Sequence, residues 1–249
     1  MIKLSVVIIT LNEEKNIARC IKSVAPIADE ILVLDSYSSD NTKTICHELG
    51  VTFVEHPFDN FVAQKNFADQ TARYNHILSL DADEELSEEL LASIKKVKAN
   101  FEADAYEFNR LNNYCGKWIK HSGWYPDRKL RLYDRTKGRW GGVKIHEKIE
   151  MQAGTSTAFL KGDLLHYTFT SVNQHIETIN RFSTISAEER IYKGKKTSTY
   201  RIIMKPLLKF LIMYFIKLGF LDGFYGFVIC VNSAHSTFLK EIKVHELNK

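Results

Sequence analysis

The sequence predicts an α/β protein whose central sheet is mainly parallel and flanked by helices, with amphipathic helices toward its C-terminal end. Apolar strand-like runs alternate with helical patterns over residues 4–100. Short strand-like runs rich in Trp, Tyr, Arg and Gly occupy residues 105–167, and a basic, apolar stretch follows residue 193. A chain of 249 residues with 45% hydrophobic content can bury a sizeable core, which excludes a disordered, collagen-like or coiled-coil protein.

The first part of the chain contains four apolar runs that we expect to be strands. They are Leu4–Thr10, Glu30–Asp35, Val51–Glu55 and His76–Asp81. Helical spacing predicts helices at Glu13–Val24, Asn41–Gly50, Phe61–Thr71 and Ser87–Asn100. This alternation builds a parallel sheet, and ligands of such sheets bind beyond the carboxyl ends of the strands. Carboxylates at or just after three of these ends should therefore converge on one crevice.

The rest of the chain changes character twice. Residues 105–167 suit a mixed or antiparallel extension that covers the crevice, and residues 171–193 read as a helix. After a polar hinge at 193–199, the apolar residues of Tyr200–Phe220 recur at helical spacing on one wide face. We therefore expect one domain over residues 1–192 and a helical tail over residues 193–249.

Charge is distributed unevenly along the chain. The formal net charge is only +4, which gives no reason to expect nucleic acid as a partner. Residues 193–249 hold ten Lys and Arg against three acidic residues, a net of +7, whereas residues 1–192 carry −3. Lysines interrupt the apolar tail, so it suits the surface of an anionic membrane better than a span, although packing on its own domain or on a partner subunit remains open. The four cysteines show no paired short spacing and no secretion signal is visible, so we expect a cytoplasmic protein. The basic tail suggests peripheral attachment to the inner face of the cytoplasmic membrane.

Three polar motifs follow the expected strands. Asp81 and Asp83 form an Asp-x-Asp motif, which suits a divalent hard cation such as Mg²⁺ or Mn²⁺. Asp35 ends another strand, and its carboxylate suits recognition of a base or a ribose. Asn12 and Glu13 lie at the first strand-to-helix junction, where Asn12 is also an acceptable helix N-cap.

These motifs resemble those of family 2 glycosyltransferases, which have the GT-A fold. The segments are Ser5–Glu14, Leu34–Thr42 and Ser79–Glu84, in that family's order and roughly its spacing. The resemblance implies that residues 1–100 bind a nucleotide diphosphate sugar and residues 101–170 bind the acceptor. It places Thr10, Asn12 and Glu13 in the nucleotide pocket, Asp35 at the base, Asp81 near the ribose and Asp83 on the metal.

Shorter segments in the second half resemble small bacterial enzymes of this family that add sugars to the lipopolysaccharide inner core, including a heptose β-1,4-glucosyltransferase. They include residues 64–66, 124–128, 131–133, 146–147 and 165–167. The function that this implies is inverting transfer of a hexose, in particular glucose from a UDP-sugar, to a lipopolysaccharide core or another lipid-linked saccharide.

Such a transfer needs a base for the acceptor hydroxyl and positive charge for the leaving diphosphate. Glu147 is the first candidate for the base, because the family places its catalytic carboxylate in this region, and Asp127 is the second. The expected diphosphate- and acceptor-binding residues are Lys65, Arg128, Arg131 and Trp124, and His166 is expected to complete the metal site.

Plain structural roles remain open for several of these residues. The cations can be surface ion-pair partners, Glu147 can pair with Lys144 or Lys148, and His166 can be a core histidine. The chain as a whole can be a nucleotide-binding α/β module without transfer activity, or a glycosyltransferase acting on another cell-surface polysaccharide. A nucleotidyltransferase is disfavoured, because no Gly-rich phosphate loop followed by Lys lies near the first strand.

Overall fold

The computed structural model describes residues 1–143 and 146–248, and their contacts divide the chain into two compact units. Met1–Arg110 and Asp127–His166 form one unit, called here the sheet unit. Leu111–Pro126 and Tyr167–Lys249 form the other, called here the helical unit. This division differs from the boundary that we predicted at residue 193, because the helix before that point belongs with the C-terminal helices.

Four parallel strands lie at the start of the sheet, in the order β3-β2-β1-β4. They are β1 (Leu4–Thr10), β2 (Glu30–Asp35), β3 (Thr52–Glu55) and β4 (His76–Asp81). The helices of this unit are α1 (Ile17–Val24), α2 (Thr42–Glu48), α3 (Phe61–Thr71) and α4 (Glu88–Ala99). All seven residues of β1 are buried, as expected for a strand covered on both faces.

The sheet continues beyond β4 in the order β8-β6-β11-β5, and β4 with β8, β8 with β6, and β11 with β5 pair in antiparallel fashion. These are β5 (Glu84–Leu86), β6 (Ala105–Tyr114), β8 (Asp127–Asp134) and β11 (Thr157–Phe169), with β7 (Lys117–Ile119) paired to β6. A separate ribbon consists of β9 (Gly138–Val143) and β10 (His146–Met151). The predicted α/β class, the parallel order of the first four strands and the mixed extension of the sheet are therefore confirmed.

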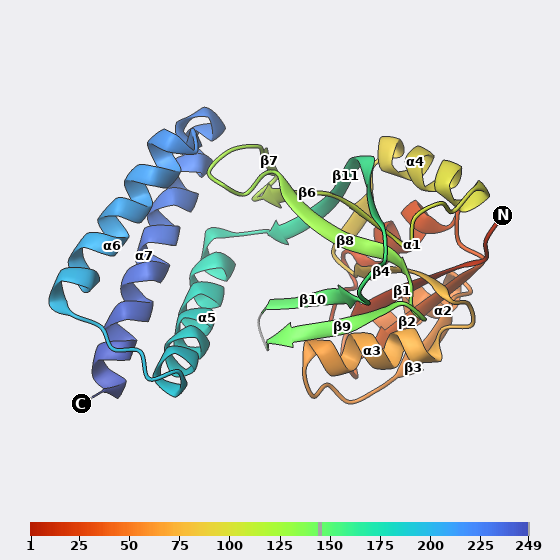
Figure 1. The fold of residues 1–249 in the computed structure, drawn as a ribbon, viewed down its shortest axis with the longest axis horizontal. Helices are drawn as coiled ribbons and strands as arrows, with labels where there is room; N and C mark the ends of the chain where they lie inside the picture. Colours follow the sequence, from red (N-terminus) through yellow and green to blue (C-terminus); the bar gives the residue numbers. More distant parts are fainter. Residues whose placement is uncertain (144–145, 249) are drawn as a thin grey trace. The chain divides into compact units, whose positions relative to one another are not determined.

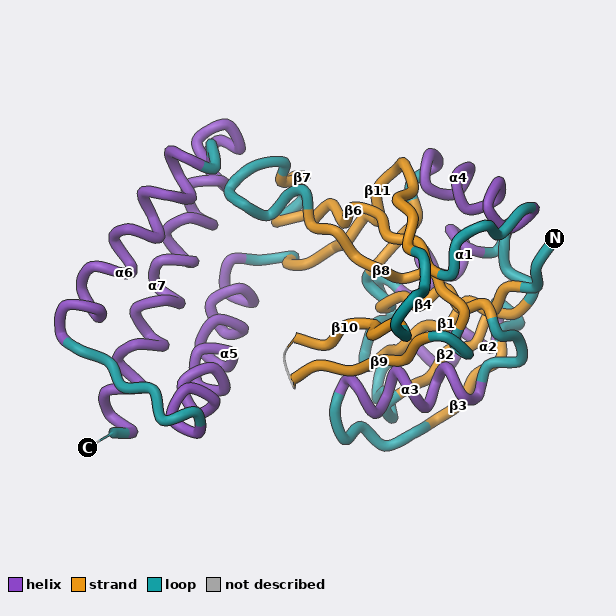
Figure 2. Tube along the Cα trace, in the orientation of Figure 1, coloured by secondary structure: helices purple, strands orange, loops and turns teal. Residues whose placement is uncertain are grey.

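Two apolar cores cover the two faces of the sheet. Figures 1 and 2 show that helices lie on both sides of it. One contains the buried sides of α1, α2 and α4, and α1 contributes Ile17, Cys20, Ile21 and Val24 at helical spacing. The other contains α3 and the β9-β10 ribbon, through Ala68, Trp140 and Ile149. The ribbon is thereby fixed against the same face as α3, which positions both beside the end of β4.

The helical unit contains α5 (Val172–Tyr192), α6 (Thr199–Leu211), the π-helical turn η1 (Ile212–Ile216), the 3₁₀ turn η2 (Gly219–Asp222) and α7 (Gly223–Leu247). The helical spacing predicted over residues 200–220 is confirmed through Ile216, but the helix does not continue to residue 220. The helix ends because Lys217 N–H bonds to Ile212 O at 2.8 Å, and Leu218 then adopts a left-handed conformation with φ of 54°. None of the described helices is long and apolar enough to cross a bilayer.

A buried histidine lies in the core of the helical unit. His175 Nδ1 is 3.0 Å from the Tyr114 hydroxyl and 3.2 Å from Asn232 Nδ2, and its ring stacks on Phe169. Burial lowers the pKa of His175 to about 4, so the core holds a neutral imidazole near pH 7.

Candidate functional site

The parallel register brings the predicted strand-end residues to one edge of the sheet. Thr10 is opposite Asp35, and Ile9 is opposite Asp81, so the ends of β1, β2 and β4 coincide. The Thr10 hydroxyl is buried and has no hydrogen-bond partner among the described residues. An unpaired buried hydroxyl at this edge suits contact with a ligand.

The loops after β1 and β2 are fastened to each other. Asn12 adopts a φ of 55°, its N–H donates to Ser38 Oγ at 2.7 Å, and its Oδ1 accepts from Ser39 N–H at 2.8 Å. Asn12 therefore joins the two loops through hydrogen bonds and does not cap α1, which begins at Ile17. Burial raises the pKa of the neighbouring Glu13, against an opposing hydrogen bond from Asn16.

Asp35 is the buried last residue of β2. Its Oδ2 accepts from Ser38 N–H at 2.7 Å and its Oδ1 accepts from the Ser38 hydroxyl at 2.5 Å. Both oxygens thus shape the turn, a structural role that the sequence pattern did not indicate for Asp35. Its contact with a nucleotide base stays a prediction.

Asp81, at the end of β4, lies between two buried cations. Its Oδ1 is 3.0 Å from Lys65 Nζ, and its Oδ2 is 3.0 Å from Arg131 Nη2. Burial opposes ionisation of Asp81, but the charges of Lys65 and Arg131 outweigh it and hold the pKa of the carboxyl well below its usual range. Asp81 is therefore a fixed anion that orients both cations.

Lys65 also reaches the first candidate for the base. Its Nζ is 3.4 Å from Glu147 Oε1 and lies over the Trp140 ring at 4.4 Å from the centroid. The Lys65 side chain is only 1% exposed, so both carboxylates determine where its charge sits. The alternative partner Lys148 pairs instead with Glu150 at 3.6 Å, and Lys144 lies outside the described residues.

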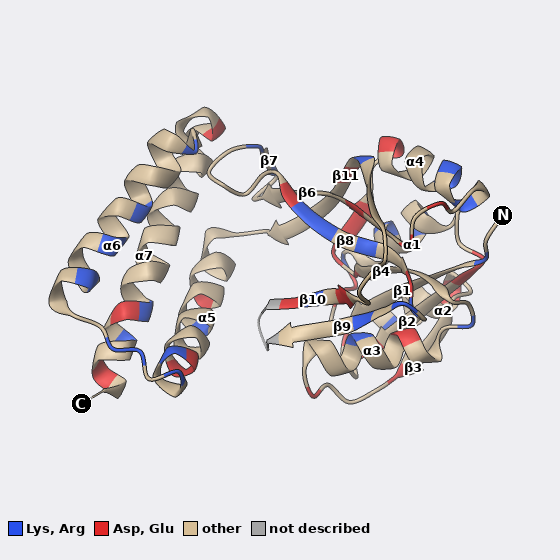
Figure 3. Ribbon diagram, viewed as in Figure 1, with Lys and Arg blue, Asp and Glu red and all other residues tan. Residues whose placement is uncertain are grey.

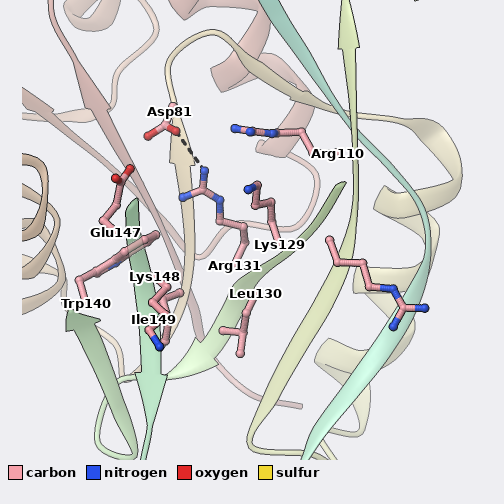
Figure 4. Close-up of a pocket in the computed structure, with 10 residues that line it drawn as sticks. Asp81, Arg110, Lys129, Leu130, Arg131, Trp140, Glu147, Lys148 and Ile149 are labelled. Atoms are coloured by element: carbon pink, nitrogen blue, oxygen red, sulfur yellow. Dashed lines mark hydrogen bonds and ion pairs between the residues drawn. The ribbon is translucent and has the colours of Figure 1, made fainter. Parts of the chain in front are cut away.

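A cavity of about 510 Å³ opens beside this cluster (Figure 4). Its charged lining consists of Arg110, Arg128, Lys129, Arg131 and Lys148 together with Asp81 and Glu147. Figure 4 shows Asp81 and Glu147 on the same side of Arg131. The excess of cations suits an anionic ligand, and Glu147 is positioned to contact it.

The turn after β4 places Asp83 beside β11. His166 is in register with Glu84, and its Nε2 is 3.1 Å from Asp83 Oδ2. One carboxylate and one imidazole fit a divalent cation that takes its other ligands from waters and a diphosphate. The described residues contain no group of three or more His, Cys, Asp or Glu side chains that could hold a metal ion, so metal binding by Asp83 and His166 stays a prediction.

The other predicted residues have partners of their own. Asp127 Oδ2 is 2.8 Å from Arg110 Nη2 and its Oδ1 is 3.0 Å from Lys129 Nζ, and Asp127 is not among the residues lining the cavity. Arg128 pairs with Glu107 at 3.1 Å, and its side chain is 62% exposed. Their roles in binding or catalysis stay predictions.

Trp124 belongs to the helical unit. It packs there against Tyr114, Phe169 and His175, with ring centroids 5.8, 6.3 and 6.0 Å apart. A structural role thus accounts for its partial burial, and its stacking on a sugar stays a prediction.

Three residues that contact the charged groups of the site, Glu84, Arg110 and Trp140, were not among the predicted site residues. Glu84 is buried and lies 3.3 Å from Arg131 Nη2 and 3.5 Å from Arg110 Nη1, while its Oε2 accepts from Asp81 N–H at 2.9 Å. Trp140 provides the aromatic face beneath Lys65. For Glu84 a signal existed, since it directly follows the Asp-x-Asp motif, whereas no motif marked Arg110 or Trp140.

Comparison with known proteins shows which family this chain is similar to. The model of the glycosyl transferase family 2 matches residues 5–162. An uncharacterised glycosyltransferase of Rickettsia typhi is 33% identical over 100% of this chain and 88% of its own length. The lipopolysaccharide core biosynthesis glycosyltransferase LpsC of Rhizobium meliloti is 29% identical over 98% of this chain and 92% of its own.

A solved structure of Staphylococcus aureus TarS residues 1–349 in complex with UDP covers 99% of this chain and 91% of its own, with 14% identity and a TM-score of 0.49. The family match covers well over half of the chain and includes all three strand-end motifs and the Lys65–Glu147 cluster. The chain belongs to glycosyltransferase family 2.

Proposed function

We propose that the protein transfers a hexose, with inversion, from a UDP-sugar to a saccharide of the lipopolysaccharide core. The similarity to LpsC over nearly the whole of both chains supports this class of acceptor. Glucose and UDP are proposed from the resemblance of the second half of the chain to inner-core glucosyltransferases. The four cysteines are free thiols, which supports a reducing compartment such as the cytoplasm.

The observation that carries the proposal is the position of Lys65. It contacts Asp81 at 3.0 Å and Glu147 at 3.4 Å, so the end of β4 and the ribbon strand β10 meet at one buried ammonium group. A module that only bound nucleotide would need the first contact but not the second. The second contact holds a carboxylate at the edge of the cationic cavity, where an acceptor hydroxyl would enter.

Residues of this chain can be assigned to the leaving diphosphate, to the metal ion and to the donor sugar nucleotide. Lys65 and Arg131 would stabilise negative charge on the leaving diphosphate, since both are buried cations beside the cavity. Asp83 and His166 would hold Mg²⁺ or Mn²⁺, which when bound neutralises charge on the diphosphate. Asp81 would orient the donor near its ribose while it fixes the two cations.

Glu147 would take the proton from the acceptor hydroxyl. Among the described residues its ion-pair partner is Lys65 at 3.4 Å, which leaves carboxylate oxygen facing the cavity. Asp127 has cations within 3.0 Å on both oxygens, and this makes it the weaker candidate. A single carboxylate base implies direct displacement and therefore inversion at the anomeric carbon.

The test combines donor binding with transfer. A thermal-shift screen of UDP-, GDP-, ADP- and CMP-sugars, with and without Mn²⁺, should show the largest shift for the UDP-sugar with the metal. Transfer to a truncated lipopolysaccharide acceptor should then fall by about 10²-fold or more in Glu147→Gln, with donor binding kept. Asp127→Asn should transfer normally.

Two outcomes would count against these assignments. Loss of transfer in Asp127→Asn with normal transfer in Glu147→Gln would exchange the roles of the two carboxylates. Donor binding without transfer to any core acceptor would favour a nucleotide-binding module, or a transferase for another polysaccharide.

A further inference from the structure

The helical unit exposes an unusual amount of apolar surface. Of the 25 large hydrophobic residues that are exposed in the described chain, 15 lie between Tyr200 and Phe238. Helix α6 packs against α7, yet none of its 13 residues is buried. Soluble monomers rarely expose contiguous apolar patches of this kind unless the patch meets a partner.

The densest part of this surface is the turn that joins α6 to α7, called here the apolar turn. It presents Phe215, Ile216, Leu218, Phe220, Leu221 and Phe224, each between 42% and 73% exposed. The backbone of this turn is closely packed against α7. A Cβ atom on Gly219 would come within 2.6 Å of Cys230 Sγ, and one on Gly226 within 2.0 Å of Gly219 O.

A buried carboxylate fixes the conformation of the apolar turn. Asp222 accepts hydrogen bonds from the Lys120 and His121 N–H groups at 3.1 and 2.9 Å, and from the Ser122 hydroxyl at 3.2 Å. The Lys117 ammonium donates to the Asp222 carbonyl at 2.6 Å. The apolar side chains are therefore displayed by a rigid turn, which lowers the entropy lost when they bind.

The charges around this surface have one sign. Residues 193–240 contain eight Lys and Arg and one acidic residue, Asp222, which is only 3% exposed. Figure 3 shows the basic residues spaced along α6. Lys209 and Lys217 are exposed and form no ion pair with any described residue. An apolar surface bordered by unpaired lysines is complementary to anionic lipid headgroups over an acyl layer.

We infer that the apolar turn and the exposed side of α6 bind an anionic lipid surface, with the turn inserted into the interfacial region. A second copy of the chain is the poorer occupant, because a two-fold contact through this patch would bring lysines of one sign together. The inference goes beyond the proposed function, since binding needs neither donor nor acceptor saccharide.

The experiment is vesicle flotation of the full-length protein without donor or metal. The vesicles contain phosphatidylcholine alone, or phosphatidylcholine with phosphatidylglycerol. We expect flotation with the anionic vesicles, loss of flotation at high salt, and little flotation with phosphatidylcholine. The double variant Phe220→Ser/Leu221→Ser should bind about tenfold more weakly or worse.

Two lysine variants and one control variant distinguish specific binding by this surface from nonspecific hydrophobic adsorption or misfolding. Lys209→Gln and Lys217→Gln should each weaken binding about fivefold, which corresponds to ~1 kcal/mol for each lysine near the membrane. Phe58→Ser is the matched control, because Phe58 is 48% exposed, close to the 44% of Phe220, but lies in the sheet unit. It should float like the wild type.

The inference is overturned if the protein does not float with anionic vesicles, or if the turn variant and the Phe58 control bind equally well. It is also overturned if light scattering shows a dimer that the turn variant dissociates, since the surface would then bind a second copy. None of these results depends on transfer activity, so each can be told apart from a failure of the proposed function.

Discussion

Substitution of Glu84 by Gln should destabilise the sheet unit and loosen the cationic side of the site. The Glu84 side chain is fully buried and is the shared counterion of Arg131 at 3.3 Å and Arg110 at 3.5 Å. The amide keeps an acceptor for Asp81 N–H but loses the charge that both guanidinium groups face. Hydrogen bonds to charged groups contribute about 1.5–3 kcal/mol against about 1 kcal/mol for neutral ones, so two weakened contacts predict a loss of about 1–4 kcal/mol.

The neighbouring residue provides a matched control on the same strand. Glu85 pairs with Arg19 at 3.4 Å, and the two side chains are 27% and 32% exposed, so Glu85→Gln should cost less than about 1 kcal/mol. Urea unfolding followed by circular dichroism measures both variants, and titration with a UDP-sugar measures the effect on binding. Equal losses in the two variants, or a loss below about 1 kcal/mol for Glu84→Gln, would show that the buried charge does not organise the cluster.

Two other outcomes follow from the site and from the helical core. Asp83→Ala should reduce transfer by on the order of 10²-fold or more, because only His166 would remain as a protein ligand of the metal ion. Transfer that kept its full dependence on Mn²⁺ in this variant would contradict the assignment of Asp83. His175 has a pKa of about 4 in the folded protein, whereas an ordinary histidine has a pKa of 6.5. Between these two pH values the unfolded state binds more protons than the folded state. The stability of the protein should therefore fall as the pH drops from about 6.5 to 4. The loss is up to about 3 kcal/mol. In urea unfolding at pH 7 and pH 4.5, His175→Gln should lose less stability than the wild type on acidification, and identical losses would rule out a neutral buried imidazole.

Local patterns predicted the parallel part of the fold and the edge at which the site lies. The apolar, β-branched runs ending in Thr10, Asp35 and Asp81 became neighbouring parallel strands whose ends coincide. The strand-to-helix alternation determines this, because parallel strands joined by helices all point the same way. The tail was predicted less well. Its apolar spacing indicated helical structure over residues 200–220, but the helix ends at Ile216, Leu218 adopts a left-handed conformation and Asp222 is buried in the turn that follows.

By itself, the sequence determined the α/β class, the strand-end carboxylates and the separation of a mildly acidic body from a basic tail. These properties depend on residue type and short-range spacing, which a linear pattern contains. Only the tertiary structure decided which charges meet: that Asp81 lies between Lys65 and Arg131, that Glu147 reaches the same lysine across 82 positions of sequence, and that Asp127 is held by Arg110 and Lys129. The physical reason is that ion pairing and burial depend on distances between elements remote in sequence, and the packing of the sheet, α3 and the β9-β10 ribbon sets those distances.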